Sequence, residues 1–284
     1  MSTQPDSKKA VRSKESLLAE LLLCKKLGWE IGFISGGISA YSQTKFKDLL
    51  KDMHRVAGEK FWLNIGALNL EELNDYLPYT KGVVGSIETV NKEIHDKVCP
   101  SKPVEPYFKM FENASKLGLK NAMTIILGLG ETIEDFEEFK RIVKKYNITK
   151  VHFYGLNPQK NTLFEDARPP NSEYQAAWIR KTRKEFPEID IQCGIWVDKV
   201  DRVAELLKAG SDSVSKFPIL KKFNSKEAEE IENQAKKAGF EFKGTLTKLP
   251  KINWNKEVNK LDLDNDLKEK TKIKLRLYLK KMNS

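Results

Sequence analysis

Short apolar segments of strand length alternate with helix-length amphipathic segments from residue 14 to residue 216. Each strand-like segment is separated from the next by about one helix, a rhythm that predicts βαβ units and a parallel sheet. Seven strands in this rhythm favour a (β/α) barrel of the α/β class over an open sheet, and no GxGxxG motif follows the first of them. The strand-like segments are residues 29–35, 61–66, 82–88, 122–127, 151–155, 189–197 and 212–216.

A closed eight-stranded barrel needs one more strand than this pattern supplies, and the first periodic segment, residues 14–27, is helical. We therefore expect a TIM-like barrel that lacks its first strand. The loss of a central strand leaves unpaired backbone groups on both of its neighbours, so another part of the chain must cover the gap.

The rhythm changes after residue 218, which predicts a barrel at residues 1–218 and a basic extension or cap at 219–284. In the extension we expect a charged helix at 226–238, a strand at 240–249 and a helix at 264–282. From Lys216 onward, 18 Lys and Arg residues stand against 10 Asp and Glu residues, which accounts for +8 of the net charge of +10. Such a surface attracts phosphates or acidic proteins, although an ordinary solvated lysine-rich surface is the simpler explanation.

The composition argues against membrane and nucleic-acid partners. No apolar run reaches the roughly 20 residues that span a bilayer, and the first residues lack the apolar core of a signal peptide. No segment combines aromatic stacking positions with interleaved Arg, as nucleic-acid modules do. We therefore expect a cytoplasmic protein.

The cysteines give no local metal signature. Cys24, Cys99 and Cys193 are 75 and 94 residues apart, without a CxxC or CxxxC pair, and their odd number argues against a disulfide framework. Cys24 lies on an amphipathic helix and Cys193 within an apolar strand, where free cysteine behaves as a small buried hydrophobe. Cys99 is the one expected loop cysteine, and burial explains it more simply than reactivity or metal ligation.

Small and polar residues follow the predicted strands at the face where barrel enzymes carry their chemistry. Glycine there lets the backbone approach a ligand, although paired glycines also occur in plain turns. A carboxylate directly after an apolar strand is costly to bury alone, so Glu88 is expected to accept hydrogen bonds from ligand hydroxyls or an ammonium group. Glu131 can instead simply begin a helix, where an acidic residue suits the dipole. The residues of this set are Ser35, Gly36, Gly37, Glu88, Asn91, Gly128, Gly130, Glu131 and Asn157.

Four segments resemble, in order, the motifs of one enzyme superfamily. The sequence SGG at 35–37 follows the strand IGFI, IETVN occupies 87–91, TIILGLGETIEDF occupies 124–136, and FYGLNPQKNT occupies 153–162. They resemble four elements of the radical S-adenosylmethionine (SAM) superfamily. In the order given, these elements hold the methionyl amine of SAM, its ribose and carboxylate, its adenine, and the adenine together with the substrate. The resemblance spans roughly residues 14–218 and is greatest to the biotin synthase and lipoyl synthase branch, including archaeal two-component lipoyl synthases.

The resemblance implies SAM as cofactor, held by the nine residues listed above, and a radical SAM type of barrel. It also implies a [4Fe–4S] cluster on a CxxxCxxC loop, and this chain contains no such loop, so it supplies no metal ligands. The implied reaction is reductive SAM cleavage with hydrogen abstraction, and sulfur insertion in lipoyl or biotin-like synthesis is the specific expectation. Weaker candidates for the pocket rim are His95, Lys102, Trp196 and Asp198.

Three interpretations stay open at this point. In the first, Met1 is internal to a longer enzyme that carries the cluster loop. In the second, the chain is a non-catalytic SAM-binding subunit that pairs with a homologous cluster-bearing protein. If the substrate of the enzyme is an acidic carrier protein, the basic end from Lys216 onward would dock it. The third is an unrelated barrel enzyme with acid–base chemistry from Glu88 and Glu131. This interpretation is the weakest, because only two of the three histidines, His95 and His152, fall near predicted strand ends. Of these, His152 lies within a strand and resembles a core residue.

Overall fold

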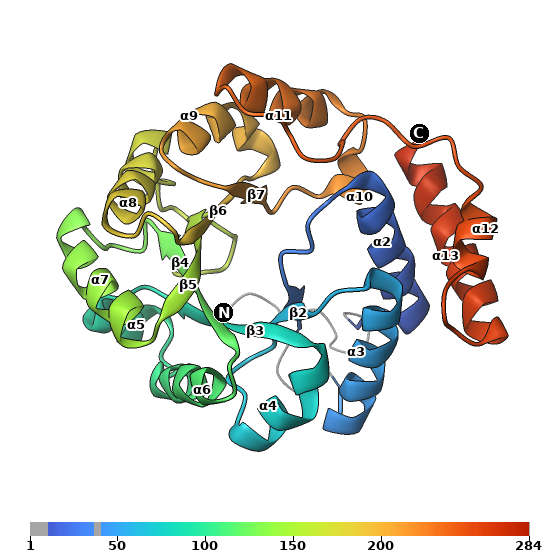
Figure 1. The fold of residues 1–284 in the computed structure, drawn as a ribbon. Coiled ribbons are helices and arrows are strands. Elements are labelled where there is room, and N and C mark those ends of the chain that lie inside the picture. The colour runs from blue at the N-terminus through green and yellow to red at the C-terminus, as the bar shows by residue number, and fades with distance from the viewer. Residues whose placement is uncertain (1–10, 37–40, 284) are drawn as a thin grey trace.

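The fold is a curled parallel sheet with its helices outside. A computed structural model describes residues 11–36 and 41–283, and its seven-stranded sheet has the strands in chain order, all parallel. Figure 1 shows the helices as a ring around the sheet. The strands are β1 (Ile34–Ser35), β2 (Phe61–Asn64), β3 (Thr80–Glu88), β4 (Lys120–Leu127), β5 (Ile148–Gly155), β6 (Asp190–Gly194) and β7 (Ser213–Ser215).

The helices follow the strands as the periodicity predicts. The helix α2 ends at Gly28 and α3 at Gly58, each in the left-handed conformation that glycine adopts without strain. The helices are α2 (Lys14–Leu27), α3 (Gln43–Ala57), α4 (Leu70–Tyr76), α5 (Lys92–Val98), α6 (Glu105–Lys116), α7 (Phe136–Lys145), α8 (Ser172–Glu185), α9 (Val203–Lys208), α10 (Ile219–Lys222), α11 (Lys226–Lys237), α12 (Trp254–Asn259) and α13 (Asn265–Met282), with 3-10 turns η1 (Leu77–Tyr79), η2 (Ile133–Asp135) and η3 (Val197–Arg202).

The main core lies between the sheet and the helices. Alternate strand residues such as Ile125, Phe153 and Cys193 face outward into it. There Trp178 of α8 is fully buried and meets the Phe139 ring edge-on, with 5.9 Å between ring centroids. This outward apolar layer explains why the central strands stand out in the sequence, and it leaves the inward-facing residues free to serve another purpose.

The predicted barrel lacking one strand is confirmed, but its first strand is shorter than expected. Only Ile34 and Ser35 of the predicted segment 29–35 pair with β2. The preceding residues turn toward the interior of the sheet, where Glu30 Oε1 lies 3.6 Å from Lys150 Nζ. The ring of Phe33 lies 5.1 Å from that of His152. Residues 30–33 therefore cover part of the inner face of the sheet instead of extending its edge.

The expected strand at 240–249 is wrong, because this segment is an irregular loop. Gly244 has φ +83° and packs so closely on Leu27 and Gly28 that a Cβ there would lie 2.4 Å from the Leu27 carbonyl oxygen. The backbone N–H of Leu246 donates to the Glu232 carboxylate at 2.6 Å, and that of Thr245 to the Leu27 carbonyl at 3.2 Å. Side chains and a helix end thus take the hydrogen bonds that a strand would have used.

The predicted helices at 226–238 and 264–282 are confirmed as α11 and α13. The helix α13 packs on α2, where the Tyr278 and Ser16 hydroxyls lie 2.5 Å apart. The helix α12 adds an ion pair between Glu257 and Lys26 of α2. The segment after residue 218 is therefore tied to the outside of the barrel at its first helix.

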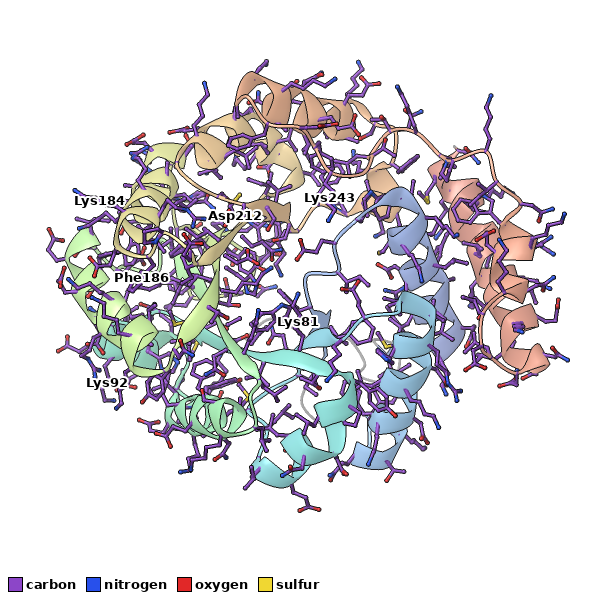
Figure 2. The ribbon with its side chains drawn as sticks, viewed as in Figure 1. Lys81, Lys92, Lys184, Phe186, Asp212 and Lys243 are labelled. Carbon is purple, nitrogen blue, oxygen red and sulfur yellow. The ribbon has the colours of Figure 1, made fainter. Side chains whose placement is uncertain are left out.

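Charged side chains project from the outer helices around the ring, as Lys92 of α5 and Lys184 of α8 show (Figure 2). None of the helices in the described part of the chain is long and apolar enough to cross a membrane.

Candidate functional site

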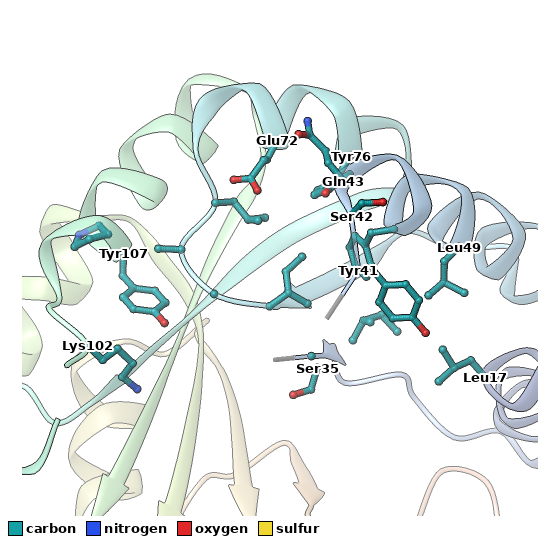
Figure 3. Close-up of a pocket in the computed structure, with 18 of the residues that line it drawn as sticks. Leu17, Ser35, Tyr41, Ser42, Gln43, Leu49, Glu72, Tyr76, Lys102 and Tyr107 are labelled. Atoms are coloured by element: carbon teal, nitrogen blue, oxygen red, sulfur yellow. The ribbon is translucent and has the colours of Figure 1, made fainter. Parts of the chain in front are cut away.

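A pocket of about 620 Å³ opens at the carboxyl ends of β1 and β2 (Figure 3). Its lining comes from the end of β1, the start of α3, the loop after β2, α4 and the loop before α6. This is the face at which parallel β/α sheets bind ligands. The polar side chains that reach it include Ser35, Gln43, Glu72 and Lys102.

Ser35 and Gly36 lie at the end of β1, exposed in this pocket. The Gly36 N–H donates to the Asn64 carbonyl at 3.1 Å, which holds this turn against β2. Among the residues that the structure describes, a Cβ at Gly36 would meet only the Ile65 side chain, at 3.4 Å. The third residue of the motif, Gly37, lies outside the described residues.

Glu88 ends β3 in an unusual backbone conformation. Its φ is +66°, which is uncommon for a residue with a side chain, and the pairing with β4 shifts by one residue between Ser86 and Glu88. The Glu88 carboxylate forms an ion pair with Lys102, whose side chain also lines the pocket. Strain of this kind is concentrated at ligand-binding positions. Glu88 is thus a carboxylate with a cationic partner at the edge of the pocket.

Asn91 and Glu131 use their side chains to shape the neighbouring loops. Asn91 caps α5 by accepting from the Ile94 N–H at 3.1 Å and donates to Asp135 Oδ1 at 2.9 Å. The buried Glu131 carboxylate accepts from the N–H groups of Gly128 at 2.7 Å and Leu129 at 2.9 Å. Each side chain is therefore partnered by protein in this structure.

The loop that Glu131 stabilises contains two glycines in the positive-φ region, Gly128 at +97° and Gly130 at +119°. At Gly128 a Cβ would lie 2.9 Å from Pro170, so a larger residue would have to displace that ring. Gly130 is exposed, and a Cβ there would make an ordinary 3.7 Å contact with the Ile94 side chain. The loop approaches the face of the sheet with backbone alone, as a ligand-contacting turn requires.

Asn157 lines a second, smaller pocket of about 30 Å³ at the carboxyl ends of β5 and β6, together with Trp196 and Asp198. The Trp196 indole N–H donates to the Gly155 carbonyl at 3.1 Å. A hydrogen bond from Lys199 lowers the pKa of Asp198. The structure thus separates these residues from Ser35 and Gly36, which line the larger pocket, although both groups lie on the same face.

The cysteines do not form a cluster site. Burial raises the pKa of the Cys24 and Cys193 thiols to about 12, and it also raises the pKa of Cys99. Within residues 11–36 and 41–283, no group of three or more His, Cys, Asp or Glu side chains is placed to hold a metal ion. The described residues therefore do not fit an iron–sulfur cluster, whose irons need thiolate ligands.

Among the local features missed in the sequence, two lie beside the strands that form the site. One is the helix α5, whose start at the Asn91 cap gives a recognisable signal. The other is a row of polar residues on the inner face of the sheet, which includes Thr124, His152 and Gln192. Their signal is an isolated polar residue in each of several strands that otherwise read largely as apolar runs.

Comparison with known proteins agrees with this geometry. Residues 2–143 match the model of the radical SAM superfamily. An uncharacterized protein of Methanocaldococcus jannaschii is 38% identical over 244 residues, which cover 86% of this chain and 67% of the relative. A 7,8-didemethyl-8-hydroxy-5-deazariboflavin synthase of Archaeoglobus fulgidus is 30% identical over 59% of this chain and 54% of its own. A biotin synthase of Methanococcus vannielii is 24% identical over 55% of this chain.

The chain spans about half the length of the deazariboflavin synthase and biotin synthase relatives, 54% and 48% respectively. Among solved structures, methylornithine synthase shares the fold with a TM-score of 0.66 and 16% identity, over 80% of this chain and 72% of its own. Fold and site together define a β/α-barrel protein with a ligand pocket at the carboxyl ends of its strands. With half of its length matching the family model, the chain belongs to the radical SAM superfamily. Its biotin synthase and deazariboflavin synthase relatives are consistent with the expected biotin synthase-like branch.

Proposed function

We propose that this protein binds SAM across the carboxyl ends of β1 to β5 and takes part in hydrogen abstraction from an unactivated carbon. The observation that carries the proposal is the pocket at Ser35 and Gly36, which lies within the region that matches the superfamily. Because the Gly36 N–H already donates to the Asn64 carbonyl, the Gly36 carbonyl is the backbone group that would accept a hydrogen bond from the methionyl amine.

The remaining positions would orient the nucleoside. Glu88 would accept hydrogen bonds from the ribose hydroxyls, with Lys102 beside it available for the SAM carboxylate. The loop with Gly130 would lie along the adenine, and Asn157 at the end of β5 would contact its edge. In the superfamily, SAM bound to a [4Fe–4S] cluster supplies the hydrogen-abstracting radical. The protein binds and orients the reactants and excludes side reactions.

Cluster ligands would have to come from outside the described residues, either from a longer form of the polypeptide or from a homologous partner subunit. In the latter case the chain is a SAM-binding subunit rather than a complete enzyme. Both candidates start from one observation, that the described part of the chain holds no three-residue group able to bind a metal.

A finer version of the proposal concerns substrate and partner. Sulfur insertion in lipoyl or biotin-like synthesis is supported by the sequence resemblance and by a biotin synthase relative. The net charge of +8 from Lys216 onward would attract an acidic carrier protein that presents such a substrate in the cytoplasm. Association with an acidic carrier protein should then weaken as the salt concentration rises, and affinity independent of salt would contradict docking by charge.

The central claim is tested by calorimetric titration with SAM and with S-adenosylhomocysteine, which needs no redox chemistry. We expect the wild-type chain to bind S-adenosylhomocysteine, and Glu88→Gln to bind it about 10-fold more weakly, because one charge-assisted hydrogen bond is lost. Glu93→Gln, an exposed carboxylate on the neighbouring helix α5, is the matched control and should bind normally. Failure of the wild type to bind either nucleoside contradicts the proposal.

The choice between enzyme and subunit is tested on protein from its native source. Intact mass above 32.6 kDa, with extra peptides that contain three cysteines and with four irons per chain, would identify a longer enzyme. A mass equal to the printed chain, together with a co-purifying cluster-bearing homologue, would support the subunit.

A further inference from the structure

The helix α13 near the end of the chain is hydrogen-bonded to residues at the start of α2. Figure 1 shows α13 alongside α2, and the two helices pack together. The Arg12 guanidinium donates to the Tyr278 hydroxyl at 2.9 Å and to the Ser16 hydroxyl at 3.1 Å. The two hydroxyl oxygens themselves lie 2.5 Å apart. Three side chains from the two ends of the sequence thus form one hydrogen-bonded set, which we call the Tyr278 cluster.

Two residues that line the large pocket are attached to this cluster. The Tyr41 hydroxyl donates to the Arg12 carbonyl at 2.8 Å, and Tyr41 lines the pocket. Leu17, the residue after Ser16, lines the same pocket. Figure 3 shows Tyr41 and Leu17 at one end of it. One part of the pocket wall is therefore held in place from α13, through Arg12 and Ser16.

The Tyr278 cluster is not explained by the attachment of α13 to the barrel. The helix already buries Leu275 and Met282 in the main core, and the ion pair between Glu257 and Lys26 holds α12 beside it. The Arg12 side chain is 42% exposed. Polar contacts at such positions contribute about 1 kcal/mol or less to stability. Holding the pocket wall is the effect that remains for the cluster to explain.

Arg12 is held from two sides. Its guanidinium forms an ion pair with Glu20 on α2, which directs the side chain along that helix. Tyr278 contacts the same guanidinium from α13. The position of the Arg12 backbone, and with it the carbonyl that Tyr41 binds, therefore depends on both helices.

We infer that Tyr278 is a positioning residue for the SAM pocket, acting through Arg12 and Ser16 on Tyr41 and Leu17. This inference rests on the proposed function and deepens it, since it makes the helix α13 a support of the SAM site rather than a separate cap.

The place of the two wall residues predicts which part of SAM depends on Tyr278. They line the pocket together with Ser35 and Gly36, where the methionyl group would bind. Asn157, which would contact the adenine, lines the other pocket. A displaced wall should therefore weaken the contacts to the amino-acid part of the ligand and leave the contacts to the nucleoside unchanged.

Calorimetric titration of the full chain tests this difference with two probes, S-adenosylhomocysteine and 5′-methylthioadenosine, which lacks the amino-acid part. We expect Tyr278→Phe to bind S-adenosylhomocysteine about 5-fold more weakly, because the hydrogen bond that fixes Arg12 from α13 is lost. Its affinity for 5′-methylthioadenosine should equal that of the wild type. Tyr146→Phe, which removes a tyrosine hydroxyl directly after α7, is the matched control and should bind both probes normally. Unchanged affinity of Tyr278→Phe for S-adenosylhomocysteine overturns the inference, and so does an equal loss for both probes, since that would mark a general disturbance of the fold.

A double variant tests the path through Tyr41. Tyr41→Phe should weaken S-adenosylhomocysteine binding by a similar factor, and the double variant with Tyr278→Phe should bind no more weakly than the weaker single variant, because both changes release the same part of the wall. Losses that multiply would show that Tyr278 acts by another route and would overturn the inference. Binding of S-adenosylhomocysteine by the wild type that does not depend on Tyr278 leaves the proposed function intact, whereas no binding by the wild type removes both.

Discussion

The ring of Tyr154 on β5 occupies the place where residue 194 on β6 would carry a side chain. A Cβ at Gly194 would lie 1.9 Å from Tyr154 Cδ1 and 2.7 Å from Cε1, distances that require the ring to move. The two residues are directly paired across the strands, so the glycine cannot move away independently. Gly194 thus determines where the Tyr154 hydroxyl lies.

Gly194→Ala should therefore displace Tyr154 and destabilise the protein by about 1–3 kcal/mol, as expected for overpacking of a filled interior. The matched control is Gly155→Ala at the end of β5, where a Cβ would make an ordinary 3.4 Å contact with Pro170. Urea unfolding of both variants measures the effect, and equal stability of the two would contradict it.

Lys150 and Asp190 form an ion pair of 2.8 Å between β5 and β6, with the lysine side chain 1% and the aspartate side chain 42% exposed. Because the two side chains differ in exposure, we expect their substitutions to lower the free energy of unfolding by different amounts. Asp190→Asn leaves the buried ammonium group with Glu30, at 3.6 Å, as its remaining carboxylate among the described residues, and should cost about 3 kcal/mol. Lys150→Met leaves a carboxylate that water can reach and should cost less than about 1 kcal/mol. Denaturant unfolding at pH 7 would contradict this account if Lys150→Met were the more damaging change.

Much of the barrel could be predicted because its strands are buried on their outer faces by helices and read as apolar runs. The same reasoning failed at residues 240–249, where the alternation of apolar and polar residues resembles a strand but the segment does not pair with the sheet. There the Glu232 carboxylate binds the Leu246 N–H, a contact across 14 residues that no local pattern encodes. Local periodicity does not determine which group will satisfy a backbone amide.

The candidate site was predictable to the extent that strand ends share one face. Ser35 and Gly36 line the larger pocket as neighbours of Lys102, which was expected only at its rim. The division between this pocket and the one that contains Asn157 depends on loop packing and was not predictable. His152 resembled a core residue because the outward-facing residues of its strand are apolar. Only its register with Thr124 and Gln192 reveals a layer of polar residues on the inner face.

The loop after β4 is organised by a single carboxylate, since Glu131 accepts from two successive backbone N–H groups. Glu131→Gln places an amide in a site with two donors and should cost about 2 kcal/mol in the free energy of unfolding. Because the loop would lie along the adenine, affinity for S-adenosylhomocysteine should also fall. Glu188→Gln, an exposed carboxylate outside this loop, is the control. Unchanged unfolding of Glu131→Gln would show that the loop does not depend on this charge.

The buried imidazole of His152 predicts a dependence of stability on pH. Its pKa is lowered to about 3, first by burial and then by the charges of Lys150 and Lys216, whereas an unfolded histidine titrates near 6.5. Below pH 6.5 the unfolded chain therefore binds a proton that the folded chain does not, and stability falls as the pH falls from 6.5 toward 3. Between pH 7 and pH 5 this amounts to about 2 kcal/mol from His152 alone.

The variant His152→Phe isolates that contribution, because carboxylates elsewhere titrate equally in both proteins. Urea unfolding at pH 7 and pH 5 should show a smaller loss of stability for His152→Phe than for the wild type, by about 2 kcal/mol. His54→Phe serves as the control for the loss of a histidine outside the barrel interior, since His54 lies on α3 with its ring Nδ1 against the Glu59 carbonyl. If the wild type and His152→Phe lost the same stability between the two pH values, the imidazole would be solvated and the inner face of the barrel would be open to water.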